Sequence, residues 1–204
     1  MTRLLRAGDR GWLLELDGPG IAHGVAARIR ESTWGNDLED VVPASRTVLV
    51  TVRDGADVLR VGKALETLDG SASLVAGNSR VVEIPVRYDG ADLDSLAAST
   101  GLSVEAIAEL HSSADHVVAF FGFAPGFAYI DGNPAPLRVP RRDSPRATTA
   151  AGSVAIAGGQ TVIYPGGTPG GWTIIGTTDF VAWDVSATPP ARLDVGDTIR
   201  FVRA

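Results

Sequence analysis

The sequence predicts an α+β fold, in which a small α/β domain over residues 1–78 precedes a β-rich domain over residues 79–204. Three observations predict it. The first part alternates short apolar runs with segments of helical periodicity, whereas from His116 onward apolar runs of strand length alternate with Gly/Pro clusters. The stretch around Asn78 is small and polar, which is typical of a domain boundary. Hydrophobic residues make up 45% of the chain, enough to build a core and to exclude disorder.

The first part should hold strands and helices in the order strand, helix, strand, strand, helix. Asp57 is suited to cap the second helix, because its carboxylate can accept a backbone N–H of the first turn. The predicted elements are strands over 12–16, 38–42 and 47–52 and helices over 21–30 and 58–68. This order is most of a ferredoxin-like α/β sandwich, and Leu74 and Val75 are the candidates for its missing strand.

The second part should open with one strand and two short helices and then continue as strands. Gly101 is suited to end the first helix and Ser103 to cap the second. The predicted elements are strands over 80–86, 117–121, 154–157, 161–164, 173–175, 181–183 and 198–202 and helices over 93–99 and 103–111. Short strands separated by turn residues are typical of a small barrel or sandwich.

Composition excludes several classes of function. The net charge of -6 repels polyanions, so we expect no binding to nucleic acid or to an anionic membrane. Because the chain has no cysteine, it has no disulfides, thiolate metal ligands or cysteine nucleophiles. His23, His111 and His116 are too few and too poorly spaced with carboxylates to predict a metal site, and His111 is expected to be a cation at a helix C-terminus. No apolar run has the length of a signal peptide or membrane span, so we expect a cytoplasmic protein.

Aromatic rings cluster in the Gly/Pro-rich segment that follows the predicted strand over 117–121. Phe123, Pro125 and Phe127 stand where the backbone must turn sharply, and such a loop can line a pocket. The alternative is a hydrophobic plug inside the barrel, which the pattern alone favours.

Four arginines follow in the segment over 138–146, among prolines. Arginines on proline-stiffened backbone lose less entropy when they bind a carboxylate or phosphate, so Arg141 and Arg146 are candidate ligand-binding residues. The alternative is a solvated basic loop.

Two glycine-rich turns flank the strand that ends at Tyr164. Consecutive glycine amides can form a concave nest for an anion, while an amide or aromatic side chain nearby adds hydrogen bonds and a stacking face. The candidates for the nest are Gly158, Gly159, Gly170 and Gly171, and those for the flanking contacts are Gln160, Tyr164 and Trp172. Glycine-rich hairpins are also ordinary corners of a barrel.

No catalytic residue can be assigned from motifs. Gly62-Lys63-Ala64 lacks the first glycine and the terminal Ser/Thr of a phosphate-binding P-loop, and Gly152-Ser153 lacks the second glycine of a nucleophile elbow. A nucleotide would therefore have to bind in another way or on another chain.

The second half of the chain carries an ordered set of segments that resembles one known family. The segments are Glu109-Leu110-His111, Gly122 to Tyr129, Pro140-Arg141, Pro145-Arg146, Ala151 to Thr161, Ile163-Tyr164-Pro165 and Pro169 to Gly176. They are similar to the signature of the B subunits of 5-oxoprolinase (PxpB), a family also called allophanate hydrolase subunit 1, which includes the sporulation kinase inhibitor KipI.

The resemblance implies a cyclophilin-like β-barrel after the small α/β domain. It also implies a complex with the C-type subunit of 5-oxoprolinase, similar to allophanate hydrolase subunit 2, and with a TIM-barrel-like A-type subunit. Such a complex opens the lactam 5-oxoproline to glutamate with ATP, because phosphorylation of the lactam oxygen creates a species that water can open. We expect this chain to contribute part of a shared active site and to be inactive alone.

Two other functions remain open at this stage. A binding protein like KipI would inhibit a sensor histidine kinase, gripping a helical or proline-containing segment in the barrel's pocket. A prolyl isomerase would follow from analogy of fold alone.

Overall fold

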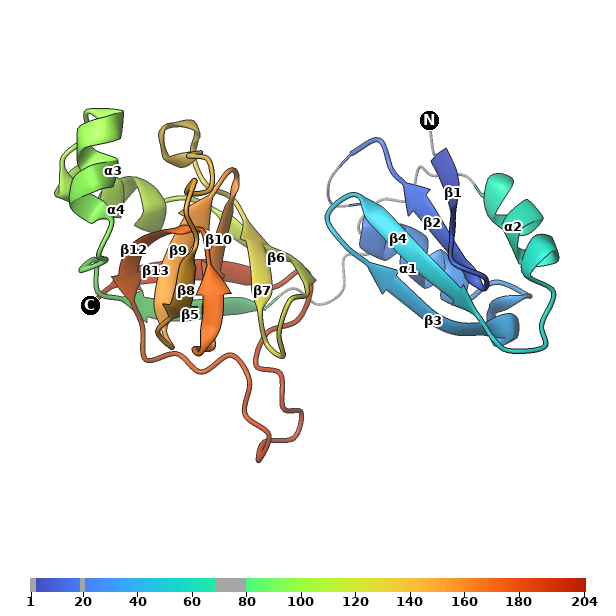
Figure 1. The fold of residues 1–204 in the computed structure, drawn as a ribbon. Coiled ribbons are helices and arrows are strands. Elements are labelled where there is room, and N and C mark those ends of the chain that lie inside the picture. The colour runs from blue at the N-terminus through green and yellow to red at the C-terminus, as the bar shows by residue number, and fades with distance from the viewer. Residues whose placement is uncertain (1–2, 19–20, 69–79) are drawn as a thin grey trace. The chain divides into compact units, whose positions relative to one another are not determined.

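The computed structural model describes residues 3–18, 21–68 and 80–204. The chain divides into two compact units, Met1–Gly77 and Asn78–Ala204. Figure 1 shows the elements of each unit, and each is described by itself below.

Over residues 3–18 and 21–68, the first unit is a four-stranded antiparallel sheet in the order β1-β2-β4-β3, with two α-helices. Its elements are β1 (Arg3–Ala7), β2 (Gly11–Glu15), α1 (Ala22–Arg30), β3 (Leu38–Pro43), β4 (Thr47–Val52) and α2 (Val58–Glu66). In β4, buried residues alternate with half-buried ones, as expected when one face of a strand packs on a core. Both helices pack into this one core, through Val25 and Ile29 of α1 and Val61 of α2. Asp57 caps α2 as predicted, accepting the Arg60 N–H at 2.9 Å.

The edge strand beside β2 comes from a segment in which the sequence predicts no strand. Leu74 and Val75, the candidates for the missing strand of the sandwich, lie outside the described residues. In the structure β2 lies between β4 and β1, and β1 pairs with it from Arg3↔Glu15 to Ala7↔Gly11. The charged residues there argue against a strand, but an edge strand tolerates charged side chains, and both Arg3 and Arg6 are exposed.

The second unit is built on a seven-stranded sheet in the order β12-β9-β10-β7-β6-β13-β5. The strands are β5 (Val81–Val86), β6 (His116–Phe121), β7 (Ala128–Asp131), β9 (Ser153–Ala157), β10 (Gln160–Ile163), β12 (Thr173–Thr177) and β13 (Thr198–Arg203). Only the β13–β5 pair is parallel among them.

The two edges of this sheet meet and nearly close it into a barrel. Arg87, just after β5, forms an antiparallel bridge with Thr177 of β12, and the two residues exchange backbone hydrogen bonds of 2.9 and 2.8 Å. Gly90 and Asp92 donate further backbone N–H groups to Ile175 and Ile174 of the same strand. The mixed α/β architecture with a barrel is therefore confirmed.

Two helices close the barrel's core. They are α3 (Leu93–Thr100) and α4 (Val104–Ser112), which pack against β12 and β13 respectively. Gly101 ends α3 with a φ of 72°, and Ser103 caps α4 by accepting the Ala106 N–H at 3.1 Å, both as predicted. The interior holds Ile84, Val118, Ile156, Ile199 and Phe201, among other apolar residues.

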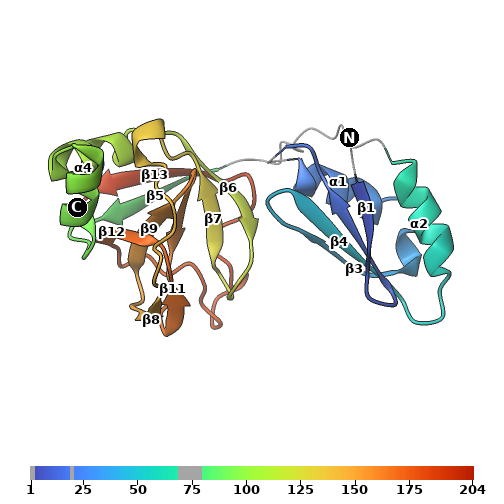
Figure 2. The ribbon, with the colours of Figure 1, turned by 45° about the horizontal axis from the view of Figure 1, so that its top comes forward.

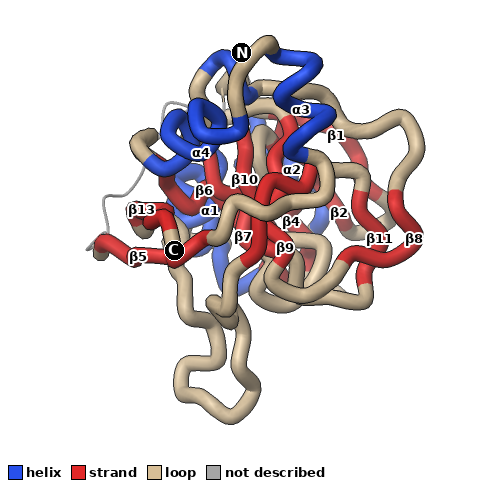
Figure 3. Tube along the Cα trace, turned by 90° about the vertical axis from the view of Figure 1, so that its left-hand side faces the viewer, coloured by secondary structure: helices blue, strands red, loops and turns tan. Residues whose placement is uncertain are grey.

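Three strands of this unit were not predicted, and one predicted strand is absent. The short ribbon of β8 (Arg146–Thr149) and β11 (Thr168–Gly170) forms a separate sheet (Figure 2), and β7 follows the aromatic loop. The segment over 181–183 is not a strand, since only Trp183 forms an isolated bridge, with Ala191. It belongs to a long loop between β12 and β13, orange-red in Figure 1, that extends away from the sheet and is seen from another side in Figure 3.

In the part of the chain that the structure describes, no helix combines the length and the apolarity needed to cross a membrane.

Candidate functional site

Strand β9 is buried on both of its faces, and this places a second apolar cluster on the outer side of the barrel. Val154 and Ile156 point into the barrel core, whereas Ala155 and Ala157 belong to the outer cluster. The outer cluster also contains Phe127, Val162, Tyr164, Trp172 and Ile174. Three of the aromatic residues that the sequence singled out therefore lie together, outside the barrel rather than in it.

A small cavity opens in this cluster, with a volume of about 90 Å³. Its wall is formed by Phe123, Phe127, Tyr129, Arg141, Tyr164, Pro169, Gly170, Gly171 and Trp172. Phe127 holds the wall together, since its ring centroid lies 5.2 Å from Tyr129 and 5.4 Å from Tyr164, both in edge-to-face geometry.

The aromatic loop combines the two alternatives that the sequence left open. Phe127 is 2% exposed and fills space, although outside the barrel, whereas Phe123 is 59% exposed at the edge of the cavity. Phe123 has a φ of 69°, which a bulky residue rarely adopts. Pro125 does not line this cavity. It faces two neighbouring hollows of about 300 and 670 Å³, which also touch Gly126 and Trp183.

Arg141 is the arginine of the 138–146 segment that faces the cavity. Its guanidinium carbon lies 5.5 Å from the centroid of the Trp172 ring, a cation–π arrangement. Among residues 3–18, 21–68 and 80–204, no carboxylate forms an ion pair with it. The indole of Trp172 is itself only 6% exposed, so Arg141 sits on a fixed platform.

Arg146 is bound elsewhere. Its Nη2 donates to Oδ1 of Asp92 at 2.6 Å, and Arg142 Nη1 donates to the same oxygen at 2.8 Å. Oδ2 of Asp92 accepts the Ile174 N–H at 2.8 Å. Burial raises the pKa of Asp92, but the hydrogen bonds from Arg146 and Ile174 and the two arginine charges outweigh it and lower the pKa overall. We predicted Arg146 as a ligand-binding residue, and its pairing with Asp92 leaves it outside the cavity wall.

Tyr164 lines the cavity beside Gly170, a position that has no room for a side chain. A Cβ at Gly170 would lie 2.4 Å from Thr149 Oγ1 and 2.6 Å from Tyr164 Oη. Only glycine therefore allows these two hydroxyl groups to lie this close to the backbone. Burial raises the pKa of Tyr164, and the charge of Arg141 and the Trp172 amide oppose this shift. The phenol is therefore neutral near pH 7 and can donate a hydrogen bond.

The two glycine turns do not surround one hollow, contrary to the prediction. Gly170 and Gly171 line the cavity, but Gly158 and Gly159 form the hairpin between β9 and β10. There the Gly158 N–H already donates to Val139 O at 2.6 Å, so it is not free for an anion. Gln160 also lies at that hairpin, where Nε2 donates to Asp131 Oδ1 at 2.7 Å. The whole of β10 separates it from Tyr164, a distance of about 13 Å for four extended residues.

His111 is not the cation that its position at a helix end predicted. It is fully buried, and burial, followed by the proximity of His116, lowers its pKa well below the ordinary value. Thr161 Oγ1 donates to Asn133 Oδ1 at 2.7 Å, so it accepts from His111 Nε2 at 3.0 Å, and His111 Nδ1 accepts from Tyr88 Oη at 2.8 Å. These bonds fix a neutral imidazole inside the barrel, and no local pattern in the sequence indicates it.

Within the described ranges, no three His, Asp or Glu side chains are grouped so as to hold a metal ion.

The chain is similar to one known family and to several known proteins. Residues 2–193 match the family described as carboxyltransferase domain, subdomain C and D. The B subunit of 5-oxoprolinase from Escherichia coli O157:H7 is 41% identical over 170 residues, which cover 81% of this chain and 78% of that protein. The B subunit of 5-oxoprolinase from Bacillus subtilis (strain 168) is 37% identical over 203 residues, 90% of this chain and 82% of that protein.

Several solved structures superpose on this chain. The crystal structure of TTHA0988 superposes with a TM-score of 0.80 at 34% identity, over 96% of this chain but only 40% of that chain. The protein PH0987 from Pyrococcus horikoshii has a TM-score of 0.59 at 32% identity, over 99% of this chain and 97% of that one. The Kluyveromyces lactis urea carboxylase shares the fold at 19% identity, with a TM-score of 0.70. From the match over residues 2–193 and the two curated relatives, the chain belongs to the family of 5-oxoprolinase B subunits, within the carboxyltransferase C and D subdomains.

Proposed function

We propose that this chain is one subunit of an ATP-dependent 5-oxoprolinase complex, which hydrolyses 5-oxo-L-proline to L-glutamate, and that it contributes part of a shared active site. One observation carries the proposal: the guanidinium of Arg141, free of any carboxylate among the described residues, is held over Trp172 at an aromatic cavity. The names of the curated relatives support membership of a complex with other subunits.

The cavity suits the two chemical groups of 5-oxoproline. Its carboxylate would take the two parallel N–H groups of a guanidinium, the arrangement in which arginine binds carboxylates most strongly. Its flat lactam ring would pack against Phe127 and Trp172, while the neutral phenol of Tyr164 would donate a hydrogen bond. Arg141, Tyr164 and Trp172 are thus the proposed substrate-binding residues.

The size of the cavity supports sharing of the site between subunits. At about 90 Å³ it is far smaller than the roughly 300–1,000 Å³ of pockets that bury a whole ligand. The exposed ring of Phe123 at its edge would then contact another protein. We propose two partners, a protein like the C-type subunit of 5-oxoprolinase and a TIM-barrel-like A-type subunit. They would supply the nucleotide site, because this chain has no P-loop.

The finer description of the fold is part of the same proposal. A ferredoxin-like domain over residues 1–78 would precede a cyclophilin-like barrel over residues 79–204. The order β1-β2-β4-β3 supports the first, since β2, β4 and β3 take the places of three strands of that fold. The nearly closed barrel with two helices supports the second.

Reconstitution tests the proposal. The full chain, co-expressed with the proteins encoded beside it, should release glutamate from 5-oxoproline only when ATP is added. Omitting this chain should abolish the release, and the chain alone should show none. A complete complex that binds together but releases no glutamate would contradict the proposal.

A second function, inhibition of a sensor histidine kinase, is favoured by exposed apolar side chains around one of the hollows beside Pro125. The hollow of about 670 Å³ is bordered by Phe123, which is 59% exposed, and by Trp183, which is 38% exposed. Val185, two residues after Trp183, is 85% exposed. Such a surface would receive a helical segment of a sensor histidine kinase, as KipI resemblance implies. Added protein should then slow kinase autophosphorylation, and an unchanged rate argues for the role in the enzyme complex instead.

A further inference from the structure

Asp92 is a buried carboxylate that the proposed chemistry does not use. It immediately precedes α3 and is 5% exposed. An ionised carboxylate is costly to bury unless it is paired and hydrogen-bonded, and Asp92 is both. Its two arginine partners, Arg142 and Arg146, both lie on the segment that carries Arg141.

Asp92 is attached to the barrel by its own backbone and side chain. Its N–H donates to Ile174 O at 3.1 Å, and its Oδ2 accepts the Ile174 N–H at 2.8 Å. This leaves Oδ1 to hold both arginines, at 2.8 and 2.6 Å. The carboxylate thus joins the closing strand β12 to the arginine segment.

Backbone bonds fix the same segment on both sides of Arg141. Val139 O accepts the Gly158 N–H at 2.6 Å, and the Arg142 N–H donates to Gly171 O at 2.7 Å. Gly171 precedes Trp172, so the residue that follows Arg141 is attached directly to the backbone of the platform. Neighbouring guanidinium groups then take different partners: Arg142 binds Asp92 and Arg141 lies over Trp172.

We infer that Asp92 is a positioning residue of the candidate site: it holds Arg142 and Arg146, fixes the 139–146 segment, and so keeps Arg141 over Trp172 and available for an anionic ligand. Without its charge, three arginines would repel one another and the anion would be shared among them. The lowered pKa of Asp92 agrees with a carboxylate that stays ionised. Its effect on 5-oxoproline rests on the proposed function, whereas the positioning of Arg141 does not.

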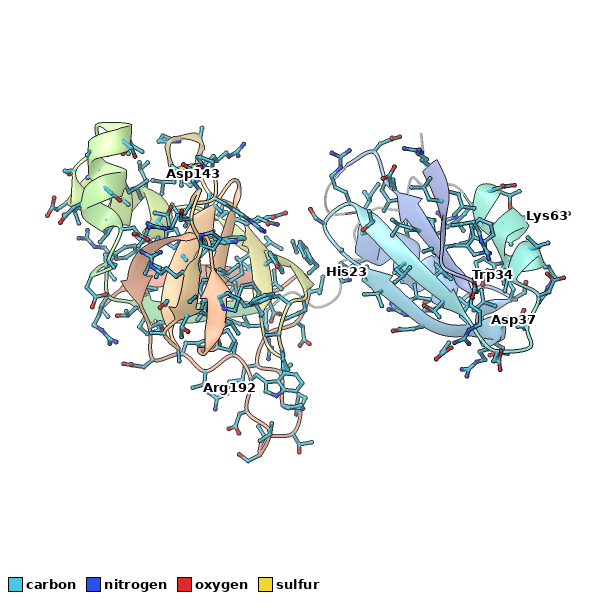
Figure 4. The ribbon with its side chains drawn as sticks, in the orientation of Figure 1. His23, Trp34, Asp37, Lys63, Asp143 and Arg192 are labelled. Atoms are coloured by element: carbon cyan, nitrogen blue, oxygen red, sulfur yellow. The ribbon has the colours of Figure 1, made fainter. Side chains whose placement is uncertain are left out.

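A test on the free full-length chain uses NMR. Side-chain protons of Arg141 above the indole of Trp172 should be shifted upfield by the ring current, and in Asp92→Asn they should move to solvent-exposed values. Asp143→Asn is the matched control, because Asp143 is an exposed acid on the same loop (Figure 4) and should leave the shifts unchanged. If Asp92→Asn fails to fold, Arg142→Met removes one of the two ties and should produce the same change. Arg141 signals that stay at their wild-type positions in a folded variant would overturn the inference.

A double-mutant cycle in the complex tests the consequence for the ligand. Asp92→Asn should raise KM for 5-oxoproline about tenfold with a smaller effect on kcat, a coupling usual for contacting residues. In an Arg141→Ala background the same change should have no further effect on KM. Full additivity of the two substitutions would contradict a role exerted through Arg141. If the wild-type complex turns over no 5-oxoproline, the proposed function fails and the NMR comparison alone decides the positioning role.

Discussion

Arg141 and Arg142 are adjacent in the chain, yet their guanidinium groups have separate environments: Arg141 lies 5.5 Å from the Trp172 ring centroid, whereas Arg142 binds Asp92 at 2.8 Å. Arg141 should therefore be sensitive to the shape of its head group as well as its charge. In Arg141→Lys the charge remains but the planar fork is lost. We expect KM for 5-oxoproline in the reconstituted complex to lie between those of wild type and Arg141→Ala. A lysine variant equal to wild type would indicate that a point charge is sufficient.

Gly170 and Gly159 should differ sharply in their tolerance of a methyl group. A Cβ at Gly170 would overlap Thr149 Oγ1 and Tyr164 Oη, so Gly170→Ala should lower the free energy of unfolding by about 1–3 kcal/mol. A Cβ at Gly159 would meet no atom within 4 Å apart from those of its chain neighbours, and Gly159→Ala should be close to neutral. Urea denaturation of both variants checks this, and equal losses would refute the close packing at Gly170.

Phe127 and Phe123 lie in one loop, but their replacement by alanine should affect different properties: stability for Phe127 and partner binding for Phe123. Phe127 is 2% exposed, so Phe127→Ala should cost about 3–5 kcal/mol of unfolding free energy. Phe123 is 59% exposed, and Phe123→Ala should change that free energy by no more than about 0.5 kcal/mol. Denaturant titrations measure both. If Phe123 contacts a partner, its variant should weaken pull-down of the other subunits, and unaltered binding would place the interface elsewhere.

The buried His111 should make the protein less stable in mild acid. Its folded pKa lies below the ordinary value of 6.5, so the unfolded chain binds the proton more readily as pH falls through that value. Stability is thus unaffected by this group above about pH 6.5 and decreases below it. His111→Gln should be less stable than wild type at pH 7.5 but should lose less on going to pH 5.5. Unfolding titrations at the two pH values measure the difference, and parallel losses in both proteins would show that other groups cause the decrease.

Local pattern predicted most helices and strands of both units, because their apolar periodicity is strong. It missed β8 and β11, which contain Arg, Thr, Pro and Gly and exist as strands only through their pairing with each other. It predicted a strand over 181–183 from composition, although that segment has no strand partner beyond a single bridge. Edge strands and short ribbons depend on distant partners, which composition does not encode.

The sequence predicted only part of the candidate site, because some of its contacts also join residues that are distant in the sequence. Phe127, Tyr164 and Trp172 converge as expected, but Gln160 was grouped with Tyr164 by proximity in sequence, and the strand between them holds them apart. Asp92 was not singled out, because a single acid before a helix resembles an ordinary cap. Its importance arises from Arg142 and Arg146, which are 50 and 54 residues away.

The most direct test of the central claim is the KM for 5-oxoproline of the reconstituted complex with wild-type chain, Arg141→Ala and Arg200→Ala. Arg200 lies on β13 in an exposed pair with Glu83 and serves as the control for loss of one positive charge. We predict that Arg141→Ala raises KM about 10- to 100-fold, as for loss of a charged hydrogen bond of about 1.5–3 kcal/mol, and that Arg200→Ala leaves it unchanged. An Arg141→Ala complex with the KM of wild type would contradict the assignment of the substrate site to this cavity.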